Sequence, residues 1–147
     1  HRVDRRQRQM CIRDSIFDIS GRAMASQLIR LNTVASNLAN AGTISGSKEE
    51  AYRSLKPVFA TQFSNAIERD GVSTVDVVGI EAITRDPERV FMPNHPSSDA
   101  DGYVYRAAVD ENEEMIEMVE ANRQYQNNVE VISTLRGLMM RTINMGK

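Results

Sequence analysis

The sequence predicts a mainly α fold with a small β insert, in which long helices near the two ends of the chain flank a short β-hairpin region. Apolar residues recur at helical spacing in two long segments, at about residues 15–42 and 110–147. Between them, residues 43–109 contain prolines, glycines and short runs of valine and isoleucine, which are typical of strands and turns. The 147 residues suffice for one domain or for one elongated unit with a small insert.

Residues 1–14 differ in charge from the rest of the chain. They hold five arginines and two aspartates, a net charge of +3, whereas the whole chain has a net charge of −2. This tail also contains the single cysteine, Cys11, and almost no apolar periodicity. It can be interpreted as a basic arm for nucleic acid or anionic lipid. The abrupt change in charge and the lack of aromatic residues favour the other interpretation, a disordered or extraneous extension.

The first helix is expected from about Ser15 to Ala41. Asn40 and Gly42 are expected to end it, because both residue types tolerate left-handed backbone angles. No charged residue occurs from Leu31 to Ser47, and the amides and hydroxyls there suit close contact with neighbouring backbones. A poorly optimised surface helix is the alternative. The apolar residues alternate in steps of four and three, as in the seam of a helix that packs on a partner helix: Phe17, Gly21, Met24, Leu28, Leu31, Ala35 and Leu38.

Residues 43–109 are expected to begin with two strands. The segment from Ser54 to Phe63 contains Pro57, which limits it to an edge strand or an interrupted one. The valine-rich segment from Gly71 to Thr84 is expected to form the second strand. Asp70-Gly71 is a suitable hairpin turn between the two.

A loop and a further strand complete the insert. Prolines and turn-forming residues from 86 to 96 predict the loop. Asp101-Gly102 then precedes a short strand from Tyr103 to Ala107. With few aromatic residues, the insert is too small to be expected to fold around a core of its own.

The last helix is expected over residues 110–147, with Asp110 as its cap and Glu113 in the position of a capping box. Acidic residues crowd its first turns, which complements the helix dipole and is equally compatible with a merely solvated face. From Val129 onward the apolar arc covers more than half the circumference, so the helix has to be covered from several sides. Because the chain has no third long helix, we expect other subunits to cover it.

Residue types that carry out catalysis or bind metals are sparse. His95 is expected in a loop, and no histidine or cysteine spacing typical of a metal site occurs. No glycine-rich phosphate loop or serine-nucleophile elbow occurs either, so we expect no cofactor, no metal and no enzyme activity. One cysteine rules out an intrachain disulfide. Without a run of about 18 apolar residues or a cleavable signal pattern, the protein is expected to stay in the cytoplasm or to leave it by a signal-independent route.

Two motifs at opposite ends of the chain resemble those of the bacterial flagellar rod and hook proteins, a family of axial proteins. The first is Ala35–Ala41 (ASNLANA), which follows Arg30-Leu31-Asn32 and precedes Tyr52-Arg53. The second is Arg123–Val131 (RQYQNNVEV). Two separated motifs make the resemblance specific.

A third stretch narrows the resemblance to the proximal-rod members of this family. It contains Pro96, Asp99 and Gly102-Tyr103-Val104. The resemblance covers about Ser15 to Lys147, which strengthens the interpretation of the tail as extraneous. Asn127 departs from the pattern, because relatives usually have a small residue there.

The resemblance implies an inner axial domain in which the N-terminal and C-terminal helices pair antiparallel in a coiled-coil-like arrangement, with the β insert outside it. It implies a structural subunit that self-assembles helically and transmits torque in flagellum-dependent motility. The implied partners are copies of the chain, other flagellar rod proteins and the flagellar type III export apparatus. The implied location is the periplasm-spanning rod of the basal body, reached without a cleaved signal peptide. No nucleic acid and no direct membrane insertion are expected.

We expect the assembly interface on both terminal helices. On the first helix it comprises Leu28, Leu31, Asn32, Ala35, Asn37, Leu38 and Asn40. On the last helix it comprises Tyr125, Asn128, Val129, Ile132, Leu135, Met139 and Ile143. A coiled-coil adaptor or another structural component of a secretion system is the alternative function, and it would form a discrete small oligomer. A nucleic-acid-binding module that uses the arginine-rich tail is a further alternative, and an enzyme is the least favoured.

Overall fold

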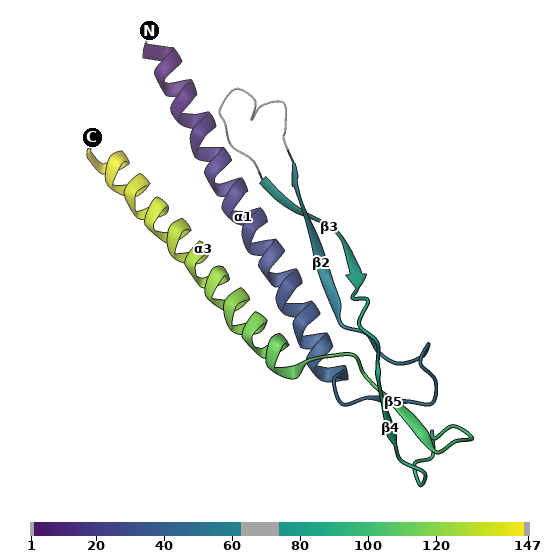
Figure 1. Ribbon diagram of the computed structural model, residues 1–147. Coiled ribbons are helices and arrows are strands. Elements are labelled where there is room, and N and C mark those ends of the chain that lie inside the picture. Colours follow the sequence, from purple (N-terminus) through teal and green to yellow (C-terminus); the bar gives the residue numbers. More distant parts are fainter. Residues whose placement is uncertain (1, 63–73, 146–147) are drawn as a thin grey trace.

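The computed structural model describes residues 2–62 and 74–145 as an elongated molecule of two long helices and five strands (Figure 1). Helix α1 spans Arg2–Asn40 and helix α3 spans Glu111–Met145. The start of α1 and the end of α3 lie at one end of the molecule, and β4 and β5 lie at the other (Figure 1). The strands are β1 (Ile44–Ser45), β2 (Leu55–Gln62), β3 (Thr74–Ala82), β4 (Glu88–Phe91) and β5 (Tyr103–Arg106).

Helix α1 is the central element. It contacts α3 along one side and both β2 and β3 along another, and Figure 1 shows it between α3 and this pair of strands. The two helices run in opposite directions, since the chain passes down α1 and returns along α3 (Figure 1). The architecture is therefore layered in the order α3, α1 and the β2–β3 sheet.

Strands β2 and β3 form a two-stranded antiparallel sheet. Pro57 pairs with Ile80 in it, and because both strands of such a sheet are edges, the prediction of an edge strand at Pro57 is confirmed. The register shifts between Val58 and Phe59, so that Val78 is the extra residue of a β-bulge. The expected hairpin turn at Asp70-Gly71, the end of the first strand at Phe63 and the start of the second at Gly71 lie outside the described residues.

A second sheet has the strand order β1-β5-β4, with both pairs antiparallel. The strand expected from Tyr103 to Ala107 is confirmed as β5. Strand β4 was not expected, because residues 86–96 were assigned to a loop. Its four residues lie between Pro87 and Pro93, and the pairing of Val90 with Val104 outweighs this local turn composition.

The predicted fold class, a mainly α protein with a coiled-coil-like helix pair and a short β-hairpin region, was wrong. The described residues combine two helices with two separate antiparallel sheets. The physical reason is that α1 divides its surface between a helix and a sheet instead of presenting one seam to one helix. Ser26 and Asn37, which lie outside the expected seam, are buried, and both bond to the β2–β3 sheet. Leu28 and Ala35, which lie in that seam, are exposed.

The two ends of α1 also differ from expectation. The helix begins at Arg2, so its backbone continues through the residues that the sequence assigns to a basic tail; that this tail is extraneous stays a prediction. At the other end, the helix stops at Asn40 without a left-handed residue, since Gly102 is the only described glycine with a positive φ. Two side-chain bonds cap it instead: Asn40 Nδ2 donates to the Ser36 carbonyl at 2.8 Å, and Thr43 Oγ1 donates to the Asn40 carbonyl at 2.7 Å.

Helix α3 begins as predicted at a cap formed by Asp110. Its Oδ1 accepts hydrogen bonds from the backbone N–H groups of Asn112 (3.0 Å) and Glu113 (3.2 Å). The Glu113 side chain does not complete a capping box. It bonds to Lys56 and Arg85 instead.

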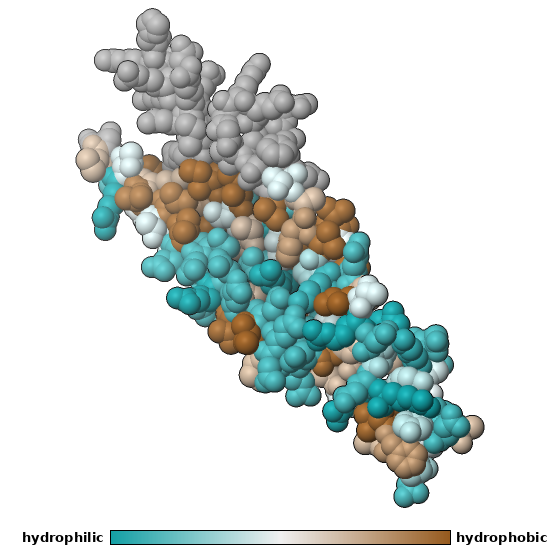
Figure 2. Space-filling model, in the orientation of Figure 1, coloured by the Kyte–Doolittle hydropathy of each residue, from teal (hydrophilic) through white to brown (hydrophobic). Residues whose placement is uncertain are grey.

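The core is made of small side chains. The buried apolar residues among the described ones are Val34, Ala41, Ala51, Val104, Ala107, Ala108 and Ala121. Many large apolar side chains are exposed. In Figure 2 they gather over the upper half of the molecule, and a smaller patch lies at the left edge near the start of α3. Neither described helix is both long and apolar enough to cross a membrane.

Candidate functional site

A buried polar junction connects the end of α1, the residues before β2 and the start of α3. Its centre is Asn37, whose side chain is fully buried. The Asn37 Nδ2 group donates to Ser54 Oγ at 3.0 Å and to the Leu55 carbonyl at 2.8 Å. Its Oδ1 accepts from the Leu55 N–H at 2.9 Å and from the Tyr52 hydroxyl at 3.1 Å. All four hydrogen-bonding positions of the amide are thus used within the subunit.

The junction continues into α3 through a second buried group. Ser54 Oγ donates to Glu114 Oε1 at 2.5 Å, and Glu114 is 2% exposed. Asn37 was predicted to lie in the assembly interface, yet the structure uses its side chain to join three segments of one subunit. A buried amide needs hydrogen-bond partners inside the protein. The spacing of apolar residues in the sequence does not show which partners it will find.

A charged cluster beside this junction ties α3 to β2. Lys56 Nζ lies 2.8 Å from Glu113 Oε1 and 3.2 Å from Glu117 Oε1. The hydrogen bond from Lys56 lowers the pKa of the Glu113 carboxyl, and the same bond raises the pKa of Lys56. Arg85 adds a contact to Glu113 at 3.3 Å. Glu113 and Glu117 in the first turns of α3 therefore bind basic side chains of other segments. From the sequence, these acidic residues were explained by the helix dipole or by a solvated face, and neither explanation includes such contacts.

Polar contacts also hold α1 against β3. Arg22 NH1 lies 3.2 Å from Asp76 Oδ2, and its Nε lies 3.1 Å from Asp18 Oδ2. The Ser26 hydroxyl lies 3.4 Å from the Val75 carbonyl. Together with the junction at Asn37, these contacts fix the β2–β3 sheet on α1 along most of its length.

Apart from the buried Asn37, the predicted interface residues are divided between two environments. Five of them are exposed: Leu28, Asn32, Ala35, Val129 and Ile143. Eight are half-buried: Leu31, Leu38, Asn40, Tyr125, Asn128, Ile132, Leu135 and Met139. The side chains of the first group are exposed in the single subunit, whereas those of the second group are partly covered within it.

Along α3, one line of residues is shielded by α1 and the rest is open. The shielded line alternates in steps of four and three: Glu114, Met118, Ala121, Tyr125, Asn128, Ile132, Leu135 and Met139. Exposed apolar residues lie on both flanks of its second half: Val129, Val131, Leu138, Met140 and Ile143. Part of the wide apolar arc expected from Val129 is therefore exposed in the single subunit, whereas Ile132, Leu135 and Met139 are half-buried.

The first half of α3 carries an exposed patch that sequence reasoning missed. Met115 and Val119 are 59% and 64% exposed. Ile116, at 68% exposure, joins them. The signal was present in the sequence, because Ile116 and Val119 lie at a helical spacing of three on the side opposite Ala121.

The loop at the far end of the molecule is organised by turn chemistry. Asp99 Oδ1 accepts from the N–H groups of Tyr103 (2.8 Å) and Asp101 (2.9 Å), and these bonds lower the pKa of Asp99. His95 lies in the same loop, as predicted, where its Nδ1 accepts from the Ser97 N–H at 3.2 Å. Over the part of the chain that the structure describes, no three His, Cys, Asp or Glu side chains come together in a way that could hold a metal ion.

Two family models match the ends of this chain, and several whole proteins match most of its length. Residues 17–43 match the family described as flagella basal body rod protein, and residues 100–145 match the flagellar basal body rod FlgEFG protein C-terminal family. The flagellar basal-body rod protein FlgC of Yersinia enterocolitica is 40% identical over 134 residues, which cover 90% of this chain and 97% of that protein. FlgC of Salmonella typhimurium is 39% identical with the same coverage.

A more distant relative matches over a similar share of the chain. FlgC of Buchnera aphidicola from Acyrthosiphon pisum is 32% identical over 136 residues, again with 90% of this chain and 97% of the relative covered. The two family matches include Asn37 on α1 and Glu114 on α3, the two buried groups of the polar junction. The chain therefore belongs to the family of flagellar basal-body rod proteins named FlgC.

Proposed function

We propose that this chain is a structural subunit of the proximal rod of the bacterial flagellum, where it self-assembles helically and transmits torque. The observation that carries the proposal is the division of α3 into a line shielded by α1 and a set of large apolar side chains left exposed. Extended exposed apolar surface on a helix is typical of a subunit that is completed by neighbours. The similarity to basal-body rod proteins indicates that the assembly is a flagellar rod.

The energetics favour assembly. Each large apolar side chain contributes about 1.5–3 kcal/mol when it becomes fully buried. Val129, Val131, Leu138, Met140 and Ile143 are between 44% and 55% exposed, so burial in a rod would recover a considerable part of that free energy. Because the core of the single subunit is small, burial of this surface is the main way in which the molecule can remove further apolar area from water.

A torque-transmitting part has to resist bending between its segments. The bonds of Asn37 and Glu114, with the Lys56 cluster beside them, join α1, β2 and α3 at a single point. Separating buried polar groups from their hydrogen-bond partners costs free energy. This junction therefore opposes rotation of the β segments relative to the helices. In our proposal, residues 15–42 and 110–147 form the inner part of the rod wall, and residues 43–109 lie outside it.

The remaining aspects of the proposal follow from this role. The partners are copies of the chain, other flagellar rod proteins and the flagellar type III export apparatus, and no nucleic acid or membrane insertion is involved. The subunit acts in the basal body after export through that apparatus. It is not an enzyme and uses no cofactor, and residues 1–14 are dispensable.

Gene deletion with complementation tests the proposal. The gene is deleted in the flagellated host, which then receives either the full-length copy or a copy that lacks residues 1–14. We expect both copies to restore swimming and both proteins to be found in purified basal bodies. Rescue by the full-length copy alone would make the tail functional. Unchanged swimming after deletion, in a host without a second copy, would contradict the rod assignment and favour an adaptor that forms a discrete oligomer.

A further inference from the structure

The second sheet, formed by β1, β5 and β4, lies apart from the rest of the molecule. Helix α1 packs against α3, β2 and β3, but within the described residues no strand of the second sheet packs against either helix. Figure 1 shows β4 and β5 extending beyond the end of α1 and the start of α3. The position of this sheet is therefore set by the chain segments that lead to it, and not by packing on the helices.

One short segment, the strap of residues 52–54, links the chain of the second sheet to the first sheet. The Ile83 N–H donates to the Ser54 carbonyl at 2.8 Å, which extends the pairing of β2 with β3. On the other side, the N–H of Ala108, two residues after β5, donates to the Tyr52 carbonyl at 2.8 Å. Ala108 also forms a parallel bridge with the middle residue of the strap. The strap thus has backbone bonds to the continuations of both β3 and β5.

Two side chains of the strap fix it to the helices. Ser54 Oγ accepts a hydrogen bond from Asn37 of α1 at 3.0 Å and donates one to Glu114 of α3 at 2.5 Å. The Tyr52 hydroxyl donates to Asn37 Oδ1 at 3.1 Å. Because Asn37 and Glu114 are buried, separating them from these partners costs free energy. The three bonds therefore hold the strap, and the chain after β5 that is bonded to it, in one place between α1 and α3.

The first sheet has attachments to α1 that do not involve the strap. Arg22 NH1 lies 3.2 Å from Asp76 Oδ2 on β3, and the Ser26 hydroxyl lies 3.4 Å from the Val75 carbonyl. Helix α1 also packs along both β2 and β3. Release of the strap from the helices is therefore expected to leave the first sheet on α1.

A cleft of about 420 Å³ lies beside the strap, between the base of the second sheet and the ends of the two helices. Ala41, Asp110 and Glu111 line it from the ends of the helices. Glu88 and Arg106 line it from the second sheet. The cleft gives the second sheet room to turn toward the start of α3.

We propose that the second sheet is a hinged unit, locked in its position by the bonds of Tyr52 and Ser54 to Asn37 and Glu114. When these bonds open, the strap moves away from the helices and the second sheet turns into the cleft. The pairing of strands inside each sheet does not use these side chains, so both sheets stay intact. The outer end of the subunit can thereby change its angle while the helix pair and the first sheet keep theirs. Every contact in this device lies within one subunit, so it does not depend on the proposed rod function.

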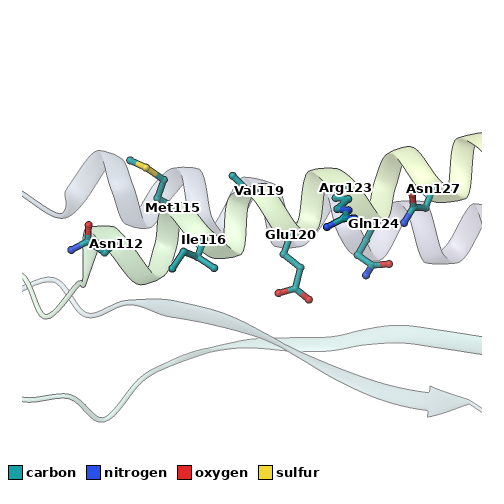
Figure 3. A pocket seen from close by; sticks show the side chains of 8 residues that line it. All are labelled: Asn112, Met115, Ile116, Val119, Glu120, Arg123, Gln124 and Asn127. Carbon is teal, nitrogen blue, oxygen red and sulfur yellow. The ribbon is translucent and has the colours of Figure 1, made fainter.

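Distances between two spin labels in the isolated chain test the hinge. In a Cys11→Ser background, the labels are attached at Met115→Cys on α3 and at Ala100→Cys in the loop between β4 and β5. Both positions are exposed, and Met115 lies about one turn beyond Asn112, which lines the cleft (Figure 3). Pulsed electron paramagnetic resonance is expected to give one narrow distance distribution for this labelled chain. Addition of Ser54→Ala is expected to produce a second, shorter distance.

A second label pair and two tyrosine variants serve as matched controls. Labels at Ala25→Cys on α1 and Val78→Cys on β3 report on the first sheet, and Ser54→Ala should leave their distance unchanged. Tyr52→Phe removes one hydroxyl from the strap and should give the shorter distance in a smaller fraction of molecules than Ser54→Ala does. Tyr105→Phe removes a hydroxyl from β5, outside the strap, and should give the distribution of the parent chain.

Hydrogen exchange distinguishes opening of the hinge from unfolding. The Ala108 N–H, which bonds to the strap, is expected to exchange at least about tenfold faster in Ser54→Ala than in the parent chain. The Met92 N–H, which donates to the Gly102 carbonyl at 2.9 Å at the far end of the second sheet, should keep its protection. This pattern would show that the sheet has moved as a folded unit.

The possible results decide the proposal without touching the rod function, which incorporation and swimming test separately. A single unchanged distance in folded Ser54→Ala would overturn the hinge. Equal changes in both label pairs, or loss of protection at Met92, would overturn it as well, because either result indicates general loosening. Two distances already in the parent chain would show that the side-chain bonds are not a lock. Should Ser54→Ala fail to fold, the milder Tyr52→Phe decides, and an unchanged distribution in that variant would overturn the proposal.

Discussion

Ser54 donates a hydrogen bond to the carboxylate of Glu114 across 2.5 Å, although the two residues are 60 positions apart in the chain. Both are buried, at 4% and 2% exposure. The same Ser54 oxygen accepts from Asn37 Nδ2 at 3.0 Å. One hydrogen-bonded chain therefore connects the last turn of α1, the segment before β2 and the first turn of α3. These three side chains therefore join the segment before β2 to both helices.

Replacement of Asn37 by alanine is expected to destabilise the subunit by about 2–4 kcal/mol. The variant leaves the Leu55 N–H, the Leu55 carbonyl and the Tyr52 hydroxyl without their partner, and an unsatisfied buried polar group costs roughly 1–3 kcal/mol. Urea-induced unfolding followed by circular dichroism measures this change. Asn32→Ala is the control, because Asn32 is exposed on the same helix and is expected to change stability by less than about 0.5 kcal/mol. Equal effects of the two substitutions would contradict the structural role of Asn37.

The Lys56 cluster predicts a dependence of stability on pH. The pKa of Glu113 is lowered in the folded state by the bond from Lys56, so its contribution is present above the unfolded-state pKa of about 4.3 and is lost as the pH falls. The pKa of Lys56 is raised by the bond to Glu113, so its contribution is present below about pH 10.4 and is lost as the pH rises through the folded-state value. The stabilisation by this pair is therefore largest between these two limits.

Lys56→Gln tests this dependence. At neutral pH we expect the variant to be less stable by about 0.5 kcal/mol, a modest value because both side chains are more than one-third exposed to screening solvent. The difference from the parent chain should shrink below pH 4 and in high salt. Lys48→Gln, which removes the more exposed ion pair with Asp86, should have a smaller effect. A difference between Lys56→Gln and the parent that stays constant from pH 3 to pH 8 would rule out the ion pairs as its cause.

Much of the helical structure could be predicted from the sequence, because its causes are local. The cap at Asp110 depends on residues within one turn, and it is present as predicted. The line that α3 presents to α1 follows from its periodicity over about seven turns. Strand β5 was likewise foreseen, since Tyr103–Arg106 has the composition of a strand and follows a turn signal.

The rest depends on contacts between distant segments. Strand β4 exists because Val90 pairs with Val104, and the sequence around Val90 alone favours a loop. Asn37 matched a family motif, and its uncharged surroundings suggested contact with another subunit. Its actual partners at positions 52, 54 and 55 become neighbours only after the chain folds back along α1. Periodicity also could not reveal that α1 serves both a helix and a sheet, which is why the expected seam residue Leu28 is exposed.

The left-handed glycine at the tip of the second sheet should resist substitution. Gly102 has φ +79°, and a Cβ atom there would lie 3.1 Å from Phe91 Cε2 and 3.2 Å from Pro93 Cβ. Gly102→Ala is expected to lower the free energy of unfolding by about 1–2 kcal/mol, because the left-handed conformation is unfavourable for residues with a Cβ. Thermal unfolding measures the loss. Gly79→Ala is the control, since no atom lies within 4 Å of the added carbon and φ is not positive.

A buried amide oxygen offers a stabilising substitution. Gln27 Oε1 is buried without a hydrogen-bond partner among the described residues. Gln27→Met removes this oxygen and keeps a side chain of similar length, so we expect stability to increase by about 1 kcal/mol. Denaturant unfolding measures the change. A loss of stability on substitution would indicate that the amide has a partner, such as ordered water.

The exposed apolar residues near the end of α3 should matter for assembly and not for the folding of the single subunit. Ile143 is 51% exposed, so Ile143→Asp is expected to alter the unfolding free energy of the isolated chain by less than about 0.5 kcal/mol. The same change places a charge where a neighbouring subunit would have to exclude water, and a buried unpaired charge is strongly unfavourable. We therefore expect loss of swimming and of the protein from basal bodies.

Asn144→Asp provides the matched control for this variant. It adds the same negative charge at the adjacent exposed position of α3 without removing an apolar side chain. Swimming should be retained in this variant if the apolar side of the helix makes the contact. Leu31→Asp and Ile132→Asp are also expected to abolish incorporation, but both positions are half-buried in the single subunit. Their effect on unfolding therefore has to be measured as well, and a stable Ile143→Asp chain that fails to enter the rod is the result that separates assembly from folding.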